Sequence, residues 1–147
     1  MSNKQSGGAW WTAADKAEPD QQAYNDLAQW CEKLDPSEQR AGFDRVLHEI
    51  TDFGTSPQGS RKQIAGQWIA MLVDSGAFES AAIALMPRTS TFSGGRLQNG
   101  TFVAQVVLEG SAGAHSREAQ SLAMAWLAAL LRAFARQAAE AKGALTH

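Results

Sequence analysis

Residues 116–141, SREAQSLAMAWLAALLRAFARQAAEA, constrain the fold more than any other stretch of the chain, because they predict a helix that is apolar round most of its circumference. The uncharged part, residues 119–131, is too short for a membrane span, which needs about 20 apolar residues. We therefore expect a long buried helix that begins after a cap at Ser116 and is covered on more than one side. A β-hairpin and a short helix would cover one side, and the N-terminal helices or a second copy of the chain would cover the other.

Three amphipathic helices are predicted within residues 20–76, where apolar residues recur every three or four positions. Asp20, Asp35 and Ser60 are the expected N-caps, and Asp35 begins a capping box with a proline at the first helical position. Gly54 and Gly76 are the expected stops of the second and third helices. The stripes predicted to face the core are Tyr24, Leu27, Ala28, Cys31 and Leu34 in the first helix, Phe43, Val46, Leu47, Ile50 and Phe53 in the second, and Ile64, Ala65, Trp68, Met71 and Leu72 in the third.

The chain changes character after residue 87, where β-branched and aromatic residues become frequent. Residues 89–93 and 102–108 are predicted strands, and the turn signals Gly94-Gly95 and Asn99-Gly100 lie between them. Residues 78–85 predict a short helix before the strands, although their spacing also fits a strand. The result is a β-hairpin that precedes the long apolar helix.

The predicted fold is α+β, with an N-terminal three-helix region followed by an α-β-β-α unit whose long apolar C-terminal helix packs on the β-hairpin. Residues 1–19 are expected to form a flexible N-terminal arm, residues 20–76 the helical region and residues 77–147 the α-β-β-α sandwich. We expect residues 20–147 to form one compact domain, because a chain of 147 residues buries enough surface to need neither a metal nor a disulfide.

The sequence shows no motif typical of catalysis or of cofactor binding. The histidines His48, His115 and His147 have no metal-ligand spacing, and the single cysteine, Cys31, lies on the apolar stripe of the first helix. The N-terminus has no signal-peptide pattern. We therefore predict a cytoplasmic protein that is not an enzyme and that has no catalytic, cofactor-binding or metal-binding residues.

Residues 81–134 resemble the small α-β-β-α sandwich proteins found widely in phages and prophages. The similarity covers AAIALMPRTSTFSGGRLQNGTFVAQVVLEG and REAQSLAMAWLAALLRAF, which run from a short helix with a Leu-x-Pro stop, through a glycine-containing hairpin, into an Ala/Leu-rich helix. The resemblance implies a phage origin. It implies no defined activity and no catalytic residues.

The leading hypothesis is a small phage-encoded protein that binds and modulates a host factor, for example a defence system as anti-CRISPR proteins do, in the host cytoplasm. It rests on the lack of a catalytic motif, a formal net charge of −2, and aromatic groups that a compact domain does not easily hide. The partner is another protein or a second copy in a homodimer, because a hairpin has free strand edges. The candidate contact residues are Trp10, Trp11, Phe92, Arg96 and Arg117.

Nucleic-acid binding is the alternative, with the candidate residues Arg61, Lys62, Arg96 and Arg117. The second and third predicted helices suggest a helix-turn-helix, but residues 54–59 are a longer link than that motif uses. Residues 113–120 look like the end of a double-stranded-RNA-binding domain, where lysines at a helix start contact phosphates. Only Arg117 is basic there, and a third strand is hard to find. The near-neutral charge disfavours this alternative, because binding to phosphates demands a basic surface.

Overall fold

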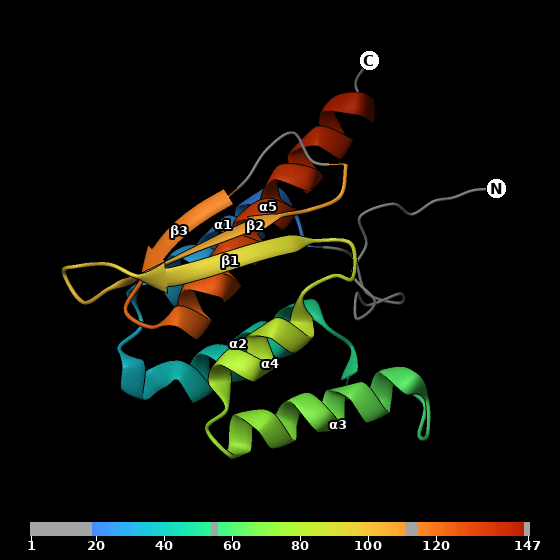
Figure 1. Ribbon diagram of the computed structural model, residues 1–147. Coiled ribbons are helices and arrows are strands. Elements are labelled where there is room, and N and C mark those ends of the chain that lie inside the picture. The colour runs from blue at the N-terminus through green and yellow to red at the C-terminus, as the bar shows by residue number, and fades with distance from the viewer. Residues whose placement is uncertain (1–18, 54–55, 111–114, 146–147) are drawn as a thin grey trace.

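The computed structural model describes residues 19–53, 56–110 and 115–145. They form an α+β fold in which helices pack on a three-stranded antiparallel sheet (Figure 1). No helix within these residues combines the length and the apolarity that crossing a membrane requires. The elements in chain order are α1 (Gln21–Lys33), the 3-10 turn η1 (Pro36–Glu38), α2 (Gln39–Ile50), α3 (Arg61–Asp74), α4 (Phe78–Leu85), β1 (Thr91–Arg96), β2 (Phe102–Val107), β3 (His115–Ala119) and α5 (Leu122–Leu145).

Side-chain caps begin three helical segments at the predicted residues. Asp20 and Ser60 each accept a hydrogen bond from the backbone N–H three residues further on, at 2.8 and 3.1 Å. Asp35 forms the predicted capping box with Glu38. Gly76, whose φ is +78°, follows α3 in the left-handed conformation that a helix stop requires. These local signals therefore fix the ends of the helices at which they stand.

The helix α2 ends earlier than predicted. It ends at Ile50 rather than at Phe53, because the backbone of Thr51 is extended. Phe53 packs instead on Gly66 of α3, where an added Cβ would lie 2.6 Å from Phe53 Cγ. Only glycine permits so close an approach, so Phe53 connects α2 with α3 rather than extending the α2 stripe. The expected stop at Gly54 lies outside the described residues.

The strands β1 and β2 form the predicted hairpin, and its turn lies at the second of the two predicted turn signals, Asn99-Gly100. Gly94 and Gly95 belong to β1, although their sequence predicts a turn. An added Cβ at Gly94 would lie 2.8 Å from Leu122 Cδ1, so α5 packs directly against the strand backbone there. Residues 97–101 form the connecting turn.

A third strand, β3, stands where the sequence predicts the start of the long helix. It pairs antiparallel with β2, and the sheet order is β1-β2-β3. Arg117 and Ala119 turn toward the helices, whereas Ser116 and Glu118 are exposed, which is the alternation of a strand. The predicted α-β-β-α unit is therefore wrong by one strand. The order from residue 78 onward is α4-β1-β2-β3-α5.

The helix α5 begins at Leu122 instead of following a cap at Ser116. Ser121 provides the cap, because its Oγ accepts a hydrogen bond from Met124 N at 3.4 Å. The helical spacing of apolar residues begins only here, while the residues before it alternate. The period of the apolar pattern thus changes from two to 3.6 at this point.

The helix α5 lies between the sheet and α1 (Figure 1). The strands β2 and β3 cover one side of it and α1 covers another, so residues 123–131 are all buried. This confirms that an N-terminal helix completes the cover of the long helix. The helix α1 packs chiefly on α5 and β3, whereas α2 and α3 contact each other. Buried residues from all of these elements join one hydrophobic core.

Candidate functional site

The outer face of α3 carries three large exposed apolar side chains. Ile64, Trp68 and Met71 are 56, 54 and 57% exposed. Their spacing of four and three residues places them in one row along the helix. Figure 1 shows α3 at the edge of the fold, next to α4. We call Ile64, Trp68 and Met71 the α3 stripe.

The exposure of the α3 stripe corrects the predicted orientation of this helix. The sequence predicts that the stripe faces the core, but α3 buries Gly66, Ile69 and Val73 instead. Its main neighbours are α4 and α2, and a helix at the edge of a fold buries only one face. The face with Gly66 is the buried one, because the lack of a side chain at Gly66 allows Phe53 to approach closely.

A hollow of about 640 Å³ borders the α3 stripe and is lined by basic side chains. Its described lining residues are Arg61, Lys62, Ala65 and Arg88. Lys62 Nζ lies 3.0 Å from Asp52 Oδ1, so this ammonium is largely neutralised. The first turn of α3 contains no acidic residue, and the helix dipole adds to the positive potential there. Arg61 and Arg88 therefore give the hollow a positive rim.

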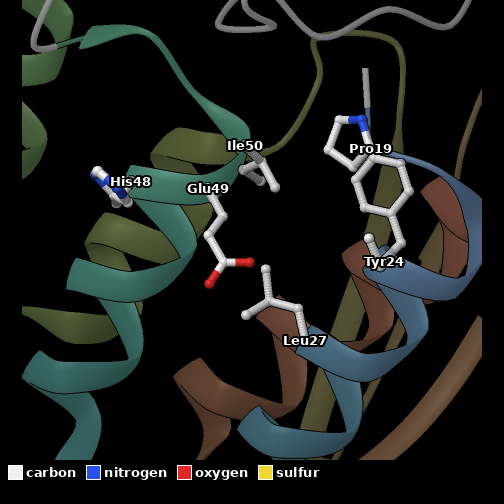
Figure 2. Close-up of a pocket in the computed structure, with 7 residues that line it drawn as sticks. Pro19, Tyr24, Leu27, His48, Glu49 and Ile50 are labelled. Atoms are coloured by element: carbon white, nitrogen blue, oxygen red, sulfur yellow. The ribbon is translucent and has the colours of Figure 1, made fainter. Parts of the chain in front are cut away.

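A second hollow, of about 320 Å³, lies between α1 and α2 (Figure 2). Figure 2 shows Glu49 pointing between the two helices toward Leu27, whereas His48 points to another side of α2. Glu49 also accepts a hydrogen bond from Arg45 at 2.7 Å. The imidazole and the carboxylate therefore do not converge on one point, as an acid–base pair would. The residues that line this hollow are Pro19, Ala23, Tyr24, Leu27, His48, Glu49 and Ile50.

The predicted contact residues Phe92 and Arg96 lie on the same face of β1. Phe92 is 38% exposed and packs edge-on against Trp126, with ring centroids 5.8 Å apart. Trp126 is buried, and its Nε1 donates a hydrogen bond to Ser93 O at 3.0 Å. Phe92 thus shields the rim of the core, while Arg96 is exposed.

Arg117, a candidate in both functional hypotheses, belongs to an ion cluster with Glu32 and Arg132. Arg117 Nε lies 2.8 Å and Arg132 Nε 3.2 Å from Glu32 Oε2, and each arginine also donates to Oε1. Burial acts to raise the pKa of Glu32, but the hydrogen bonds and charges of Arg132 and Arg117 outweigh it and hold this pKa below its usual value. The cluster joins β3 and α5 to α1. Much of the charge of Arg117 is therefore engaged within the protein.

The remaining predicted residues lie apart from one another. Trp10 and Trp11 lie outside the described residues. Arg61 and Lys62 belong to the first turn of α3, whereas Arg96 ends β1 in the sheet, which Figure 1 shows in a different layer. The four basic candidates for nucleic-acid binding thus do not form one row. Residues 51–60 separate α2 from α3, which is longer than the turn of a helix-turn-helix.

The described residues offer little for metal or thiol chemistry. Nowhere in residues 19–53, 56–110 and 115–145 do three or more His, Cys, Asp or Glu side chains gather in a way that could hold a metal ion. Cys31 is buried in α1, and burial raises the pKa of its thiol to about 12. A thiol that stays protonated at neutral pH is a poor nucleophile.

Sequence reasoning missed the α3 stripe as an exposed surface and Arg88 as part of the hollow. A signal for the stripe was present, because residues 64–73 hold apolar side chains on two faces, the stripe on one and Ile69 with Val73 on the other. That is more than a helix at the edge of a fold can bury. Arg88 carried no signal, because it follows α4 and meets α3 only in the folded protein.

Comparisons of the chain with models of protein families, with curated proteins and with solved structures found no match. The resemblance of residues 81–134 to phage sandwich proteins therefore stays a prediction. The support for the candidate site is its geometry in this structure alone.

Proposed function

We propose that this protein binds another protein through the α3 face, which we define as the α3 stripe together with Arg61, Ala65 and Arg88. The observation that carries the proposal is the row of three large apolar side chains, each more than half exposed, on one helix. Contiguous apolar surface of this kind marks interaction sites in soluble proteins. Trp, Met and Arg are among the residues enriched at such sites.

The α3 stripe alone is too small for a stable complex. Burying a whole side chain of this kind contributes about 1.5–3 kcal/mol, so covering the exposed half of three of them contributes roughly 2–5 kcal/mol. Association costs an estimated 4–15 kcal/mol in lost freedom of motion. The partner therefore needs further contacts, and Arg61 and Arg88 at the edge of the stripe are placed to make them.

The partner that fits this surface is an amphipathic segment with an apolar face and flanking carboxylates. The apolar face would pack along the α3 stripe, as helices do in grooves and on helix surfaces. The carboxylates would meet Arg61 and Arg88, which supports both register and rate of association. The resemblance of residues 81–134 to phage proteins supports a host factor as the owner of this segment.

The test uses the full chain with a photo-crosslinking residue at Gln67, an exposed position next to Trp68. The same residue at Gln98, in the turn between β1 and β2, is the matched control. A protein that crosslinks at Gln67 and not at Gln98 is purified, and its Kd for the unmodified chain is measured by calorimetry. We expect Trp68→Ala to raise this Kd more than about tenfold, as loss of a central tryptophan does at protein interfaces.

Two further variants separate the α3 face from the hairpin surface predicted from sequence. Phe92→Ala should leave the Kd nearly unchanged, whereas Arg61→Glu combined with Arg88→Glu should raise it, most strongly at low salt. An equal Kd for the wild type and Trp68→Ala would overturn the proposal. If the residue at Gln67 crosslinks to a second copy of the chain, the α3 face forms a homodimer and does not bind a separate partner.

Double-stranded RNA binding is the second candidate function, and β3 is the observation that favours it. The third strand completes an α-β-β-β-α order over residues 78–145. The basic residues that such a domain uses to contact phosphates are lacking here, because Arg117 is paired with Glu32 and the first turn of α5 is apolar. A mobility-shift titration with duplex RNA at about 50 and 200 mM salt decides between the two functions. RNA binding predicts a shift that weakens steeply with salt, and the α3 proposal predicts none.

A further inference from the structure

The described chain begins beside the end of α2, on the side where α3 starts. Pro19 lines the same hollow as Ile50, the last residue of α2 (Figure 2). Two residues after Ile50, Asp52 contacts Lys62 in the first turn of α3, with 3.0 Å between Oδ1 and Nζ. Pro19, where residues 1–18 join the described chain, therefore lies near the segment that connects α2 with the first turn of α3.

The length of this segment, fully extended, exceeds the length of the α3 stripe. Trp11 stands eight residues before Pro19 in the sequence. An extended chain covers about 3.3–3.6 Å per residue, so these residues span up to roughly 26–29 Å. Trp68 lies only about 10 Å along the helix axis from Arg61, since an α-helix rises 1.5 Å per residue.

The segment also has the composition that the α3 face requires of a partner. Trp10 and Trp11 supply a large apolar surface. Residues 12–18 follow with two carboxylates, Asp15 and Glu18, against one lysine, while the other lysine of the segment, Lys4, precedes the tryptophans. Arg61 and Arg88 on the rim of the hollow are the complementary charges.

A tethered segment needs less contact than a separate molecule does. Its effective concentration at the site is on the order of millimolar, because the chain connection already holds it nearby. The α3 stripe, which is too small to hold a separate partner by itself, is large enough to hold a segment of its own chain part of the time.

We propose that residues 1–18 dock on the α3 face of their own chain, with Trp10 and Trp11 on the α3 stripe, and that they compete there with the protein partner. The inference rests on the proposed function in that both use the same surface. Docking in this way would keep Trp68 covered in the free protein and would make partner binding conditional on release of the segment.

The test places a nitroxide label on the full chain at Thr12→Cys and records the indole N–H signals of the ¹⁵N-labelled protein by NMR. Cys31 does not take the label, because it is buried and its pKa is raised to about 12. The signal of Trp68 is assigned with Trp68→Phe. We expect the nitroxide to broaden the Trp68 signal by more than about half and to broaden Trp126 less, because distance controls the effect and Trp126 lies under β1.

Two controls make the result decisive. The same label at Gln98→Cys, in the turn between β1 and β2, should leave the Trp68 signal intact. Adding Trp10→Ser and Trp11→Ser to the Thr12→Cys chain should restore the Trp68 signal and tighten binding of the purified partner. Both tryptophans lie outside the described residues, and a thermal melt checks that the variant is folded.

The outcomes separate this inference from the proposed function. An unbroadened Trp68 signal overturns the docking of residues 1–18, whereas the proposed function fails only if Trp68→Ala leaves the partner's Kd unchanged. Broadening of ¹⁵N-labelled protein by a nitroxide carried on unlabelled molecules would place the segment on a second copy. That result would also overturn docking within one chain.

Discussion

The helices α5 and α3 are both rich in apolar residues, yet most apolar side chains of α5 are buried and the largest ones of α3 are exposed. Trp126 on α5 is 8% exposed, whereas Trp68 on α3 is 54% exposed. The helix α5 has the sheet on one side and α1 on another, so its residues 123–131 are all buried. The helix α3 packs mainly on α4 and α2, which leaves its second apolar face in solvent. The number of packed neighbours, and not apolar content, decides which apolar residues form the core and which form a surface for binding.

The largest expected effect is that of Trp126→Ala, which tests the buried half of the comparison. Removing a buried aromatic side chain leaves a cavity and costs about 3–5 kcal/mol of unfolding free energy. The variant also loses the hydrogen bond from Nε1 to Ser93 O. Urea unfolding monitored by circular dichroism measures the change. A loss below about 1 kcal/mol would mean that Trp126 is not part of the core, and the contrast with Trp68 would fail.

Glu32→Gln tests how firmly α1 holds α5. Removing the carboxylate leaves Arg117 and Arg132 with a weaker partner, and we expect a loss of about 1–3 kcal/mol at pH 7. The matched control is Glu49→Gln, whose exposed ion pair with Arg45 contributes less than about 1 kcal/mol.

The pH dependence of the Glu32→Gln effect follows from the pKa. The pKa of Glu32 in the folded protein lies below its ordinary value of 4.5, so the stability that this carboxylate contributes is present above pH 4.5. It is lost as the pH falls through the folded-state pKa. The gap in unfolding free energy between wild type and variant should therefore shrink below pH 4.5. A gap that stays constant through this acid range would contradict the role of the ion cluster.

Gly66→Ala tests which face of α3 is the packed one. Alanine favours a helix over glycine by about 1 kcal/mol, but overpacking a tight contact costs about 1–3 kcal/mol. Because the added Cβ would meet the Phe53 ring at 2.6 Å, we expect a net loss of about 1 kcal/mol in thermal unfolding experiments. Gly143→Ala in α5 is the control, since an added Cβ there meets nothing within 4 Å, and it should be neutral or stabilising. If both changes affected stability equally, the face of α3 that carries Gly66 would not be the packed one.

The smallest expected effect is that of Trp68→Ala on stability, which tests the exposed half of the comparison. An exposed side chain has few contacts to lose, so we expect a change within about 1 kcal/mol in the same urea experiment as for Trp126→Ala. The variant should fail in partner binding rather than in folding. A loss above about 2 kcal/mol would show that Trp68 is a core residue after all.

Much of the fold could be predicted from sequence because its signals are local. Caps such as Asp20 and Ser60, the stop at Gly76 and the short helix at residues 78–85 all depend on neighbouring residues, and the structure confirms them. The strand β3 could not be predicted, because only a few alternating residues precede the long apolar helix. What makes them a strand is pairing with β2 and the contact of Arg117 with Glu32, which is distant in sequence.

The candidate site could be predicted only in part. The third helix and its apolar residues follow from spacing, and so do Arg61 and Lys62 at its start. The orientation of the helix could not be predicted from spacing, because α3 has two apolar faces and only tertiary packing determines which one is buried. The choice depends on the fit of Phe53 against Gly66, a contact between side chain and backbone that no periodic pattern reveals. Trp10 and Trp11, which lie outside the described residues, stay candidate contact residues.

The ion cluster of Glu32 connects residues that are 85 and 100 positions apart in the sequence. Of the described helices, α1 is synthesised first, while β3 and α5, on which it packs, are synthesised last. A nascent chain therefore carries the uncovered apolar stripe of α1 until β3 and α5 have been synthesised, and the core of the described residues closes only after α5 has left the ribosome. A chain that stops before α5 would expose this stripe to chaperones and proteases.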